Sequence, residues 1–308
     1  MTEKSVSVME LEKKRTRIRR PVSHIVFDIC NYCILLLVGL ITVYPLWHIV
    51  CASFTDSRLL MSYNGILLWP REFTTAAYAL MIKNPLIVKS YGNVIFIVIT
   101  SCLLSILMTS LCAYVLSVKR VFWNKYLTIV IMVTMFFNGG IVPTYLLIAK
   151  WLHLNNSYAA LILPAAINVY NMIIMRTSFE SIPESLKESA KLDGAGHLRT
   201  LFLIVLPLSK AIIAVMLLYY AVAQWNSWFQ ASIYLTSRSK YPLQLILREI
   251  LIENDTALMN NAEAGDQAAV GEAIKYAVIV FSTLPILCVY PFLQKYFTKG
   301  VMIGAVKG

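Results

Sequence analysis

The chain contains 308 residues, of which 58% are hydrophobic and only 14% are charged, and its mean hydropathy is +0.68. Because soluble globular domains carry about 25% charged residues, this composition excludes an ordinary soluble fold and favours a membrane protein. The net charge of +11 would suit nucleic-acid binding, but the distribution of the basic residues points to a membrane surface instead, so no nucleic acid is expected as a partner.

Six segments are apolar over roughly the 20 residues that a helix needs to cross a bilayer. In chain order they are 25–50, 90–116, 126–148, 158–175, 208–235 and 274–292. The sequence therefore predicts an all-α, polytopic membrane protein with six transmembrane helices. The membrane domain covers residues 25–293, between an N-terminal tail, 1–24, and a C-terminal tail, 294–308.

Most of the 27 Lys and Arg residues lie before the first segment, in the second and fourth connections, or after the sixth segment. Basic residues accumulate on the cytoplasmic side of membrane proteins, so both termini are predicted to be cytoplasmic. The basic run at 13–20 is expected to anchor the chain beside anionic lipid headgroups, and a partner-binding helix is the alternative. The long connections 51–89 and 236–273 are then predicted to lie outside.

The third segment is interrupted by a Gly/Pro-containing stretch. Irregular backbone at membrane depth is tolerated only where it is buried in protein or lines a cavity. We expect a hinge or gate there, or a helix that ends near Asn138 and is followed by a re-entrant piece. The residues concerned are Asn138, Gly139, Gly140 and Pro143.

Polar and aromatic side chains cluster within the fourth and fifth segments. Amides can bind sugar hydroxyls and aromatic rings can stack on sugar C–H surfaces, so these side chains are candidates for a substrate path. The alternative is that the amides hold helices together and the tryptophans mark the membrane interface. The six candidates are Asn168, Asn171, Gln224, Trp225, Asn226 and Trp228.

The connection 176–207 differs from the other inner loops because it carries signals for helices. Ser181, Pro183 and Glu184 form a helix-start pattern, and Gly194 and Gly196 can end that helix. A second short helix is predicted to run towards Pro207. The loop should therefore form a helix, a glycine turn and another helix on the cytoplasmic face, which another protein could push.

Within this loop stands the run Glu188-Ser189-Ala190-Lys191-Leu192-Asp193-Gly194, followed after nine residues by Ile204-Val205-Leu206-Pro207. The pattern resembles the docking signature of ABC-importer permeases, with Ser189 where the family motif has Ala. Ala113–Ser117, Trp225-Asn226 and the ending 299–308 are similar to carbohydrate-type permeases. The segment 137–145 resembles a branch that serves complex oligosaccharides in Gram-positive bacteria. The resemblance covers nearly all of residues 25–308.

This resemblance implies a type I ABC importer permease that translocates an oligosaccharide across the cell membrane by alternating access. Its implied partners are a second, different permease, two copies of a cytosolic ATPase and an extracytoplasmic solute-binding lipoprotein. The residues implied to dock the ATPase are Glu188, Ser189, Ala190, Asp193, Gly194, Ile204, Leu206 and Pro207.

No G-x-x-x-x-G-K-[ST] pattern occurs in the sequence, so ATP and Mg²⁺ are expected on the partner ATPase and no cofactor, metal site or catalytic residue is expected in this chain. An importer for another solute is the main alternative. An ion-coupled secondary transporter would need intramembrane carboxylates, for which Asp28 is almost the only candidate, and a structural scaffold would not need the docking pattern. The tail 300–308 is expected to lie ordered against the ATPases, with a solvated tail as the alternative.

Overall fold

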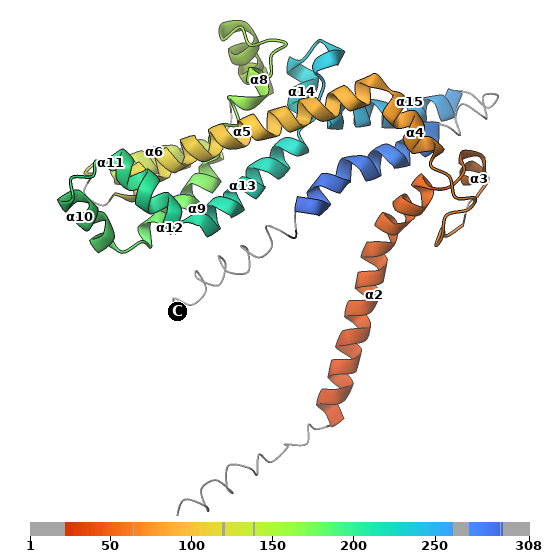
Figure 1. Cartoon of the computed structure of the whole chain (residues 1–308), viewed down its shortest axis with the longest axis horizontal. Coiled ribbons are helices and arrows are strands. Elements are labelled where there is room, and N and C mark those ends of the chain that lie inside the picture. Colours follow the sequence, from red (N-terminus) through yellow and green to blue (C-terminus); the bar gives the residue numbers. More distant parts are fainter. Residues whose placement is uncertain are drawn as a thin grey trace, which may run out of the picture. The chain divides into compact units, whose positions relative to one another are not determined.

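The computed structural model describes residues 22–63, 65–118, 121–137, 139–260, 271–289 and 291. Every regular element within these ranges is helical (Figure 1). The chain divides into two units, residues 1–49 and 50–308. The hinge candidate Asn138, the tail 294–308 and nearly all of the tail 1–24 lie outside the described residues.

The first predicted span is confirmed as the 32-residue helix α2, Val22–Ser53. The second is confirmed as the 33-residue helix α5, Pro85–Ser117. Pro85 suits the first position of α5 because proline has no backbone N–H to leave unpaired there, and Asn84 caps the helix by accepting a hydrogen bond from the Leu86 N–H (3.0 Å). Two short helices, α3 (Ser57–Ser62) and α4 (Ala76–Lys83), precede α5.

Helix α5 is the centre of the second unit, and α9 (Val169–Glu180) and α13 (Lys210–Trp225) both pack along it (Figure 1). Their contact encloses Met175, Phe179 and Met216, each with 0% of its surface exposed. The remaining helices are α6 (Asn124–Phe136), α7 (Ile141–Tyr145), η1 (Leu146–Trp151), α8 (Ala159–Ile162), α10 (Glu184–Leu192), α11 (His197–Thr200), η2 (Leu201–Val205), α12 (Leu206–Leu208), α14 (Phe229–Tyr234), η3 (Arg238–Lys240), α15 (Leu243–Asn260) and Gly271–Val289.

Three described helices are long and apolar enough to cross a membrane: Val26–Ser53 within α2, Pro85–Ser117, and Gly271–Val289. Two bent pairs, Asn124–Phe136 with Ile141–Trp151 and His197–Leu208 with Lys210–Trp225, raise the number to five if each pair is one span. The predicted interruption of the third segment is confirmed, since α6 stops at Phe136 and α7 starts at Ile141. The total of six spans stays a prediction.

The fourth and fifth segments were predicted as continuous helices, and this is wrong. The fourth is broken between Ile162 and Val169, because Pro164 cannot continue the helical hydrogen bonds and Asn168 starts a new helix by accepting from the Asn171 N–H (3.1 Å). The fifth bends at Ser209 and stops at Trp225, where the Asn226 side chain donates to the Val222 carbonyl (3.0 Å) and competes with helix continuation.

The packing of α5 against α9 predicts which phenylalanine near the inner loop matters for stability. Phe179 is 0% exposed and Phe202 is 46% exposed. We expect Phe179→Ala to destabilise the protein by about 3–5 kcal/mol through the cavity it leaves, and Phe202→Ala to have little effect. Thermal unfolding of the detergent-purified variants measures this difference, and equal losses in both would contradict the packing described.

Candidate functional site

Helix α10 begins directly after Pro183 in a short connection from α9. The predicted helix-start pattern is only partly confirmed. Pro183 precedes the first helical residue, but the Ser181 hydroxyl donates to the Ser178 carbonyl (2.7 Å) and closes α9 instead of capping α10. Glu184 occupies the first turn of α10, where a carboxylate is favoured by the helix dipole.

The predicted glycine turn is confirmed at the other end of α10. Gly194 has φ = +79°, a conformation that costs other residues about 1–2 kcal/mol. Backbone hydrogen bonds from Ala195 N to the Ala190 carbonyl (2.8 Å) and from Gly194 N to the Lys191 carbonyl (3.0 Å) close the helix around it. Gly196, predicted to help end α10, has φ = −70° and instead precedes α11.

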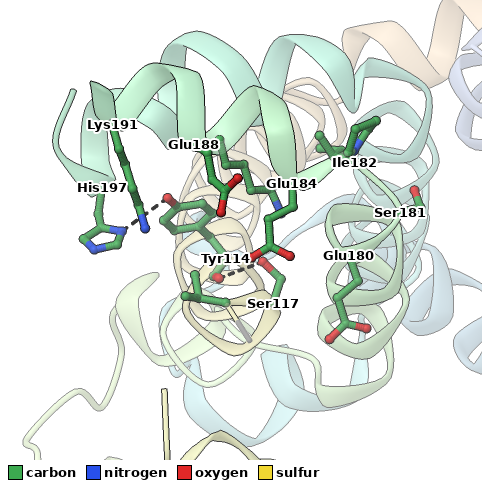
Figure 2. Close-up of a pocket in the computed structure, with 12 residues that line it drawn as sticks. Tyr114, Ser117, Glu180, Ser181, Ile182, Glu184, Glu188, Lys191 and His197 are labelled. Atoms are coloured by element: carbon green, nitrogen blue, oxygen red, sulfur yellow. Dashed lines mark hydrogen bonds between the residues drawn. The ribbon is translucent and has the colours of Figure 1, made fainter. Parts of the chain in front are cut away.

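Two side-chain contacts fasten this loop to the helices beside it. The Lys187 ammonium donates to the Phe179 carbonyl near the end of α9 (2.9 Å). His197, the first residue of α11, shares a hydrogen bond with the Tyr114 hydroxyl of α5 (3.4 Å between Nδ1 and Oη), drawn as a dashed line in Figure 2. Lys187 within α10 and His197 beyond the glycine turn thus connect the loop to α9 and α5.

A cavity of about 230 Å³ opens beside α10 (Figure 2). Its lining includes the carboxylates of Glu180, Glu184 and Glu188 and the ammonium groups of Lys187 and Lys191. Carboxylates on an accessible helix can form charge-assisted hydrogen bonds with an arginine of another protein. The surface thus offers polar contacts for a partner protein.

The docking candidates divide by exposure. Glu188, Ser189, Asp193, Gly194 and Pro207 are exposed, and Ile204 and Leu206 are half-buried. Ala190 is only 7% exposed. Most of its side chain is therefore covered by the rest of the chain, and its docking role stays a prediction.

Sequence analysis missed two apolar residues of the same loop. Leu192 is 89% exposed and Leu198 is 64% exposed, on either side of the glycine turn. Exposed leucines beside polar contacts are typical of protein–protein interfaces. The signal was available, since both leucines lie within or beside the docking pattern.

A second cavity, of about 390 Å³, lies between the broken fourth segment, α13 and α14. Its polar lining carries amides and hydroxyls, and none of its lining residues, all of which are described, is charged. Of the six predicted substrate-path residues, Asn168 and Gln224 line it. Tyr220, one turn before Gln224 on α13, and Ser227, just after the end of α13, also line the cavity and were missed by sequence analysis.

The other four substrate-path candidates lie outside this lining. Trp225 is 7% exposed, and its indole N–H donates to the Ser282 carbonyl (3.0 Å). Trp228 is covered by the Arg248 guanidinium, 3.6 Å from the ring centroid. Asn226 bonds its own helix, as described above, and Asn171 is buried (6% exposed).

The interruption of the third segment reaches this cavity through Thr144. Gly140 has φ = +87° and precedes α7, where Pro143 stands in the first turn. The Thr144 hydroxyl, which lines the cavity, donates to the Gly140 carbonyl (2.7 Å). Gly139 lies just before this turn. Within the described ranges, no three His, Cys, Asp or Glu side chains could together hold a metal ion.

Comparison with known proteins shows the family to which this chain, with its α10 loop and second cavity, belongs. A family model described as "Binding-protein-dependent transport system inner membrane component" matches residues 105–303, which include the α10 loop and most of the second cavity's lining. The chain belongs to this family. It is a membrane-embedded permease, and permeases of this kind are transport components rather than enzymes.

Two relatives from Bacillus subtilis are similar over nearly their whole length. The protein LplC is 41% identical over 92% of this chain and 95% of its own. The polygalacturonan/rhamnogalacturonan transport system permease protein YtcP is 42% identical over 92% of this chain and 98% of its own.

Solved structures support the fold of the permease. A chain from a bacterial ABC transporter involved in the import of the acidic polysaccharide alginate matches with a TM-score of 0.80 and 31% identity, over 89% of this chain and 98% of that chain. A chain from an alginate transporter in complex with a pentasaccharide-bound periplasmic protein matches in fold, with a TM-score of 0.55 and 17% identity. The predicted ABC-importer permease fold is confirmed.

The two glycines of the α10 loop give a matched test of the turn. Gly194→Ala places a Cβ at positive φ and should loosen the turn by about 1 kcal/mol, whereas Gly196→Ala keeps an allowed φ and has open space around the new Cβ. We expect faster tryptic cleavage after Lys191 only in Gly194→Ala. Equal cleavage rates in the two variants would show that the turn does not depend on Gly194.

Proposed function

We propose that this permease forms the membrane path of an ATP-driven importer for an oligosaccharide, with α10 as the helix that receives the force of ATP hydrolysis. The observation that carries the proposal is the α10 loop, which presents Glu188, Asp193 and Leu192 outward while Lys187 and His197 fasten it to α9 and α5. A surface that is exposed on one side and anchored on the other is suited to transmit motion.

The assembly that we propose contains a second, different permease, two cytosolic ATPase subunits and an extracytoplasmic solute-binding lipoprotein. ATP and Mg²⁺ would bind to the ATPases, because this sequence has no phosphate-binding loop of its own. Closure of the ATPase pair would draw the two permeases' docking helices together and turn the cavity outward. The close relatives from Bacillus favour the cell membrane of a Gram-positive bacterium.

An oligosaccharide is the substrate class that the second cavity supports best. Its polar groups are neutral amides and hydroxyls, which pair with sugar hydroxyls without requiring a charge. The named substrates of similar permeases are polygalacturonan and rhamnogalacturonan for YtcP and arabinooligosaccharides for a relative that is 30% identical. The test is uptake of labelled oligogalacturonides, arabino-oligosaccharides and maltodextrins by the assembled transporter, and uptake of none of them would favour another solute.

The docking role of α10 predicts the effect of a charge reversal. Glu188→Lys would place an ammonium against a partner arginine, so we expect sugar-stimulated ATP hydrolysis to fall by about tenfold or more while the permease still inserts into the membrane. Glu72→Lys is the matched control, since it makes the same change in the segment before α4. Normal stimulation in the Glu188→Lys transporter would refute docking at α10.

The proposed orientation predicts which loops reagents can reach from outside. In a background without the six native cysteines, Trp69→Cys should react with a membrane-impermeant thiol reagent added to intact cells. Lys191→Cys should react only after the cells are opened. External labelling of Lys191→Cys would reverse the orientation and exclude a cytosolic ATPase as the partner of α10.

A further inference from the structure

The break in the fourth segment, residues 163–168, lies beside the middle of a membrane-spanning helix. Ser101 is the central residue of the 33-residue helix α5, and Ser105 follows one turn later. Both are 0% exposed and face the break. The break therefore lies beside the middle of a helix that is long and apolar enough to span the bilayer, an environment in which water does not freely supply hydrogen bonds.

Side chains of α5 and α13 hold the broken backbone at three points. The Gln224 amide donates to the Leu161 carbonyl (3.3 Å) and to the Ser101 hydroxyl (2.8 Å). The Ser105 hydroxyl donates to the Ala165 carbonyl (3.1 Å).

At the end of the break, the Tyr220 hydroxyl accepts from the Asn168 N–H (3.2 Å) and shares a hydrogen bond with the buried Thr109 hydroxyl (2.7 Å). Each of these bonds satisfies a group that the loss of helix leaves open. The break is thus a built element rather than a loose connection.

Three backbone carbonyls of the break, those of Pro164, Ala166 and Ile167, accept no hydrogen bond from the residues that the structure describes. Of these three residues, Pro164 and Ile167 line the second cavity. An unpaired carbonyl at this depth is costly unless water or a ligand in the cavity supplies the donor. Sugar hydroxyls are such donors, and the cavity around them is polar and uncharged.

We propose that the break 163–168 is a main-chain subsite for carbohydrate hydroxyls, in which the Pro164 and Ile167 carbonyls accept from the sugar. Ser105, Tyr220 and Gln224 are positioning residues that hold these carbonyls in place. This inference rests on the proposed function, since it assigns the recognition of a sugar to a particular stretch of this chain. It also gives Gln224 a role other than direct sugar contact, because its amide N–H groups are used by Leu161 and Ser101.

The test uses Ser105→Ala and Tyr220→Phe, which each remove one hydroxyl and keep the packing. In the reconstituted transporter with its binding protein, the readout is the amount of sugar taken up per ATP hydrolysed, with labelled oligogalacturonides, arabino-oligosaccharides and maltodextrins as probes. We expect this ratio to fall by about three- to tenfold, as for one ordinary hydrogen bond lost, while binding-protein-stimulated ATP hydrolysis is kept. Thr100→Val is the control, because the Thr100 hydroxyl donates only to carbonyls of its own helix, those of Phe96 and Ile97.

A second measurement does not depend on those variants. Ile167→Cys, in the cysteine-free background, should react with a thiol reagent and be protected by the transported sugar, whereas Ile99→Cys on α5 should not be protected. The subsite would be overturned if the amount of sugar taken up per ATP hydrolysed were unchanged in both hydroxyl variants. It would also be overturned if uptake and ATP hydrolysis fell equally and the sugar did not protect Ile167→Cys. If the unaltered transporter takes up none of the three sugars, the proposed function fails and the subsite fails with it.

Discussion

A backbone group that is not in a helix must find a hydrogen-bond partner inside the membrane, and this requirement organises the permease. The chain breaks its helices near Ser209 and between Trp225 and Phe229, and it breaks the fourth segment at 163–168. In an aqueous protein, water would satisfy such breaks. At the break 163–168 the partners are the Ser105 hydroxyl of α5 and the Gln224 amide and Tyr220 hydroxyl of α13. The polar residues of α5 therefore belong to its buried face although the helix as a whole is strongly apolar.

The same constraint links the two candidate sites. Helix α9 begins at the break, next to the Asn168 cap, and ends at Glu180, one residue after the Phe179 carbonyl that accepts from Lys187 of α10. Its 12 residues span about 18 Å at the rise of an α-helix. Helix α5 also connects the break with the α10 loop. Its Ser105 and Thr109 lie at the break, and its Tyr114 lies at the α10 loop. Two packed helices thus connect the α10 loop with the wall of the second cavity.

Sequence reasoning was accurate where a local rule is sufficient. The need for positive φ identified Gly194, and apolar length identified α2 and α5. It failed where averaged hydropathy concealed a break. The fourth segment is strongly apolar on average, and only Pro164 and the capping residue Asn168 indicated that it is two helices. Ala190 shows a different limit, since the burial of its side chain depends on the tertiary packing of the loop, which no local pattern specifies.

The neutral lining of the second cavity suits the recognition of sugar hydroxyls but not discrimination between charged and neutral sugars. Amides, hydroxyls and main-chain carbonyls distinguish a hydroxyl-rich solute from an apolar one, but they place no positive charge opposite an acidic sugar. Arg248, a cation beside this region, is stacked on Trp228 and is absent from the lining. In the importer that we propose, this permease recognises the hydroxyls of a carbohydrate, and discrimination by charge is left to the solute-binding protein or the second permease.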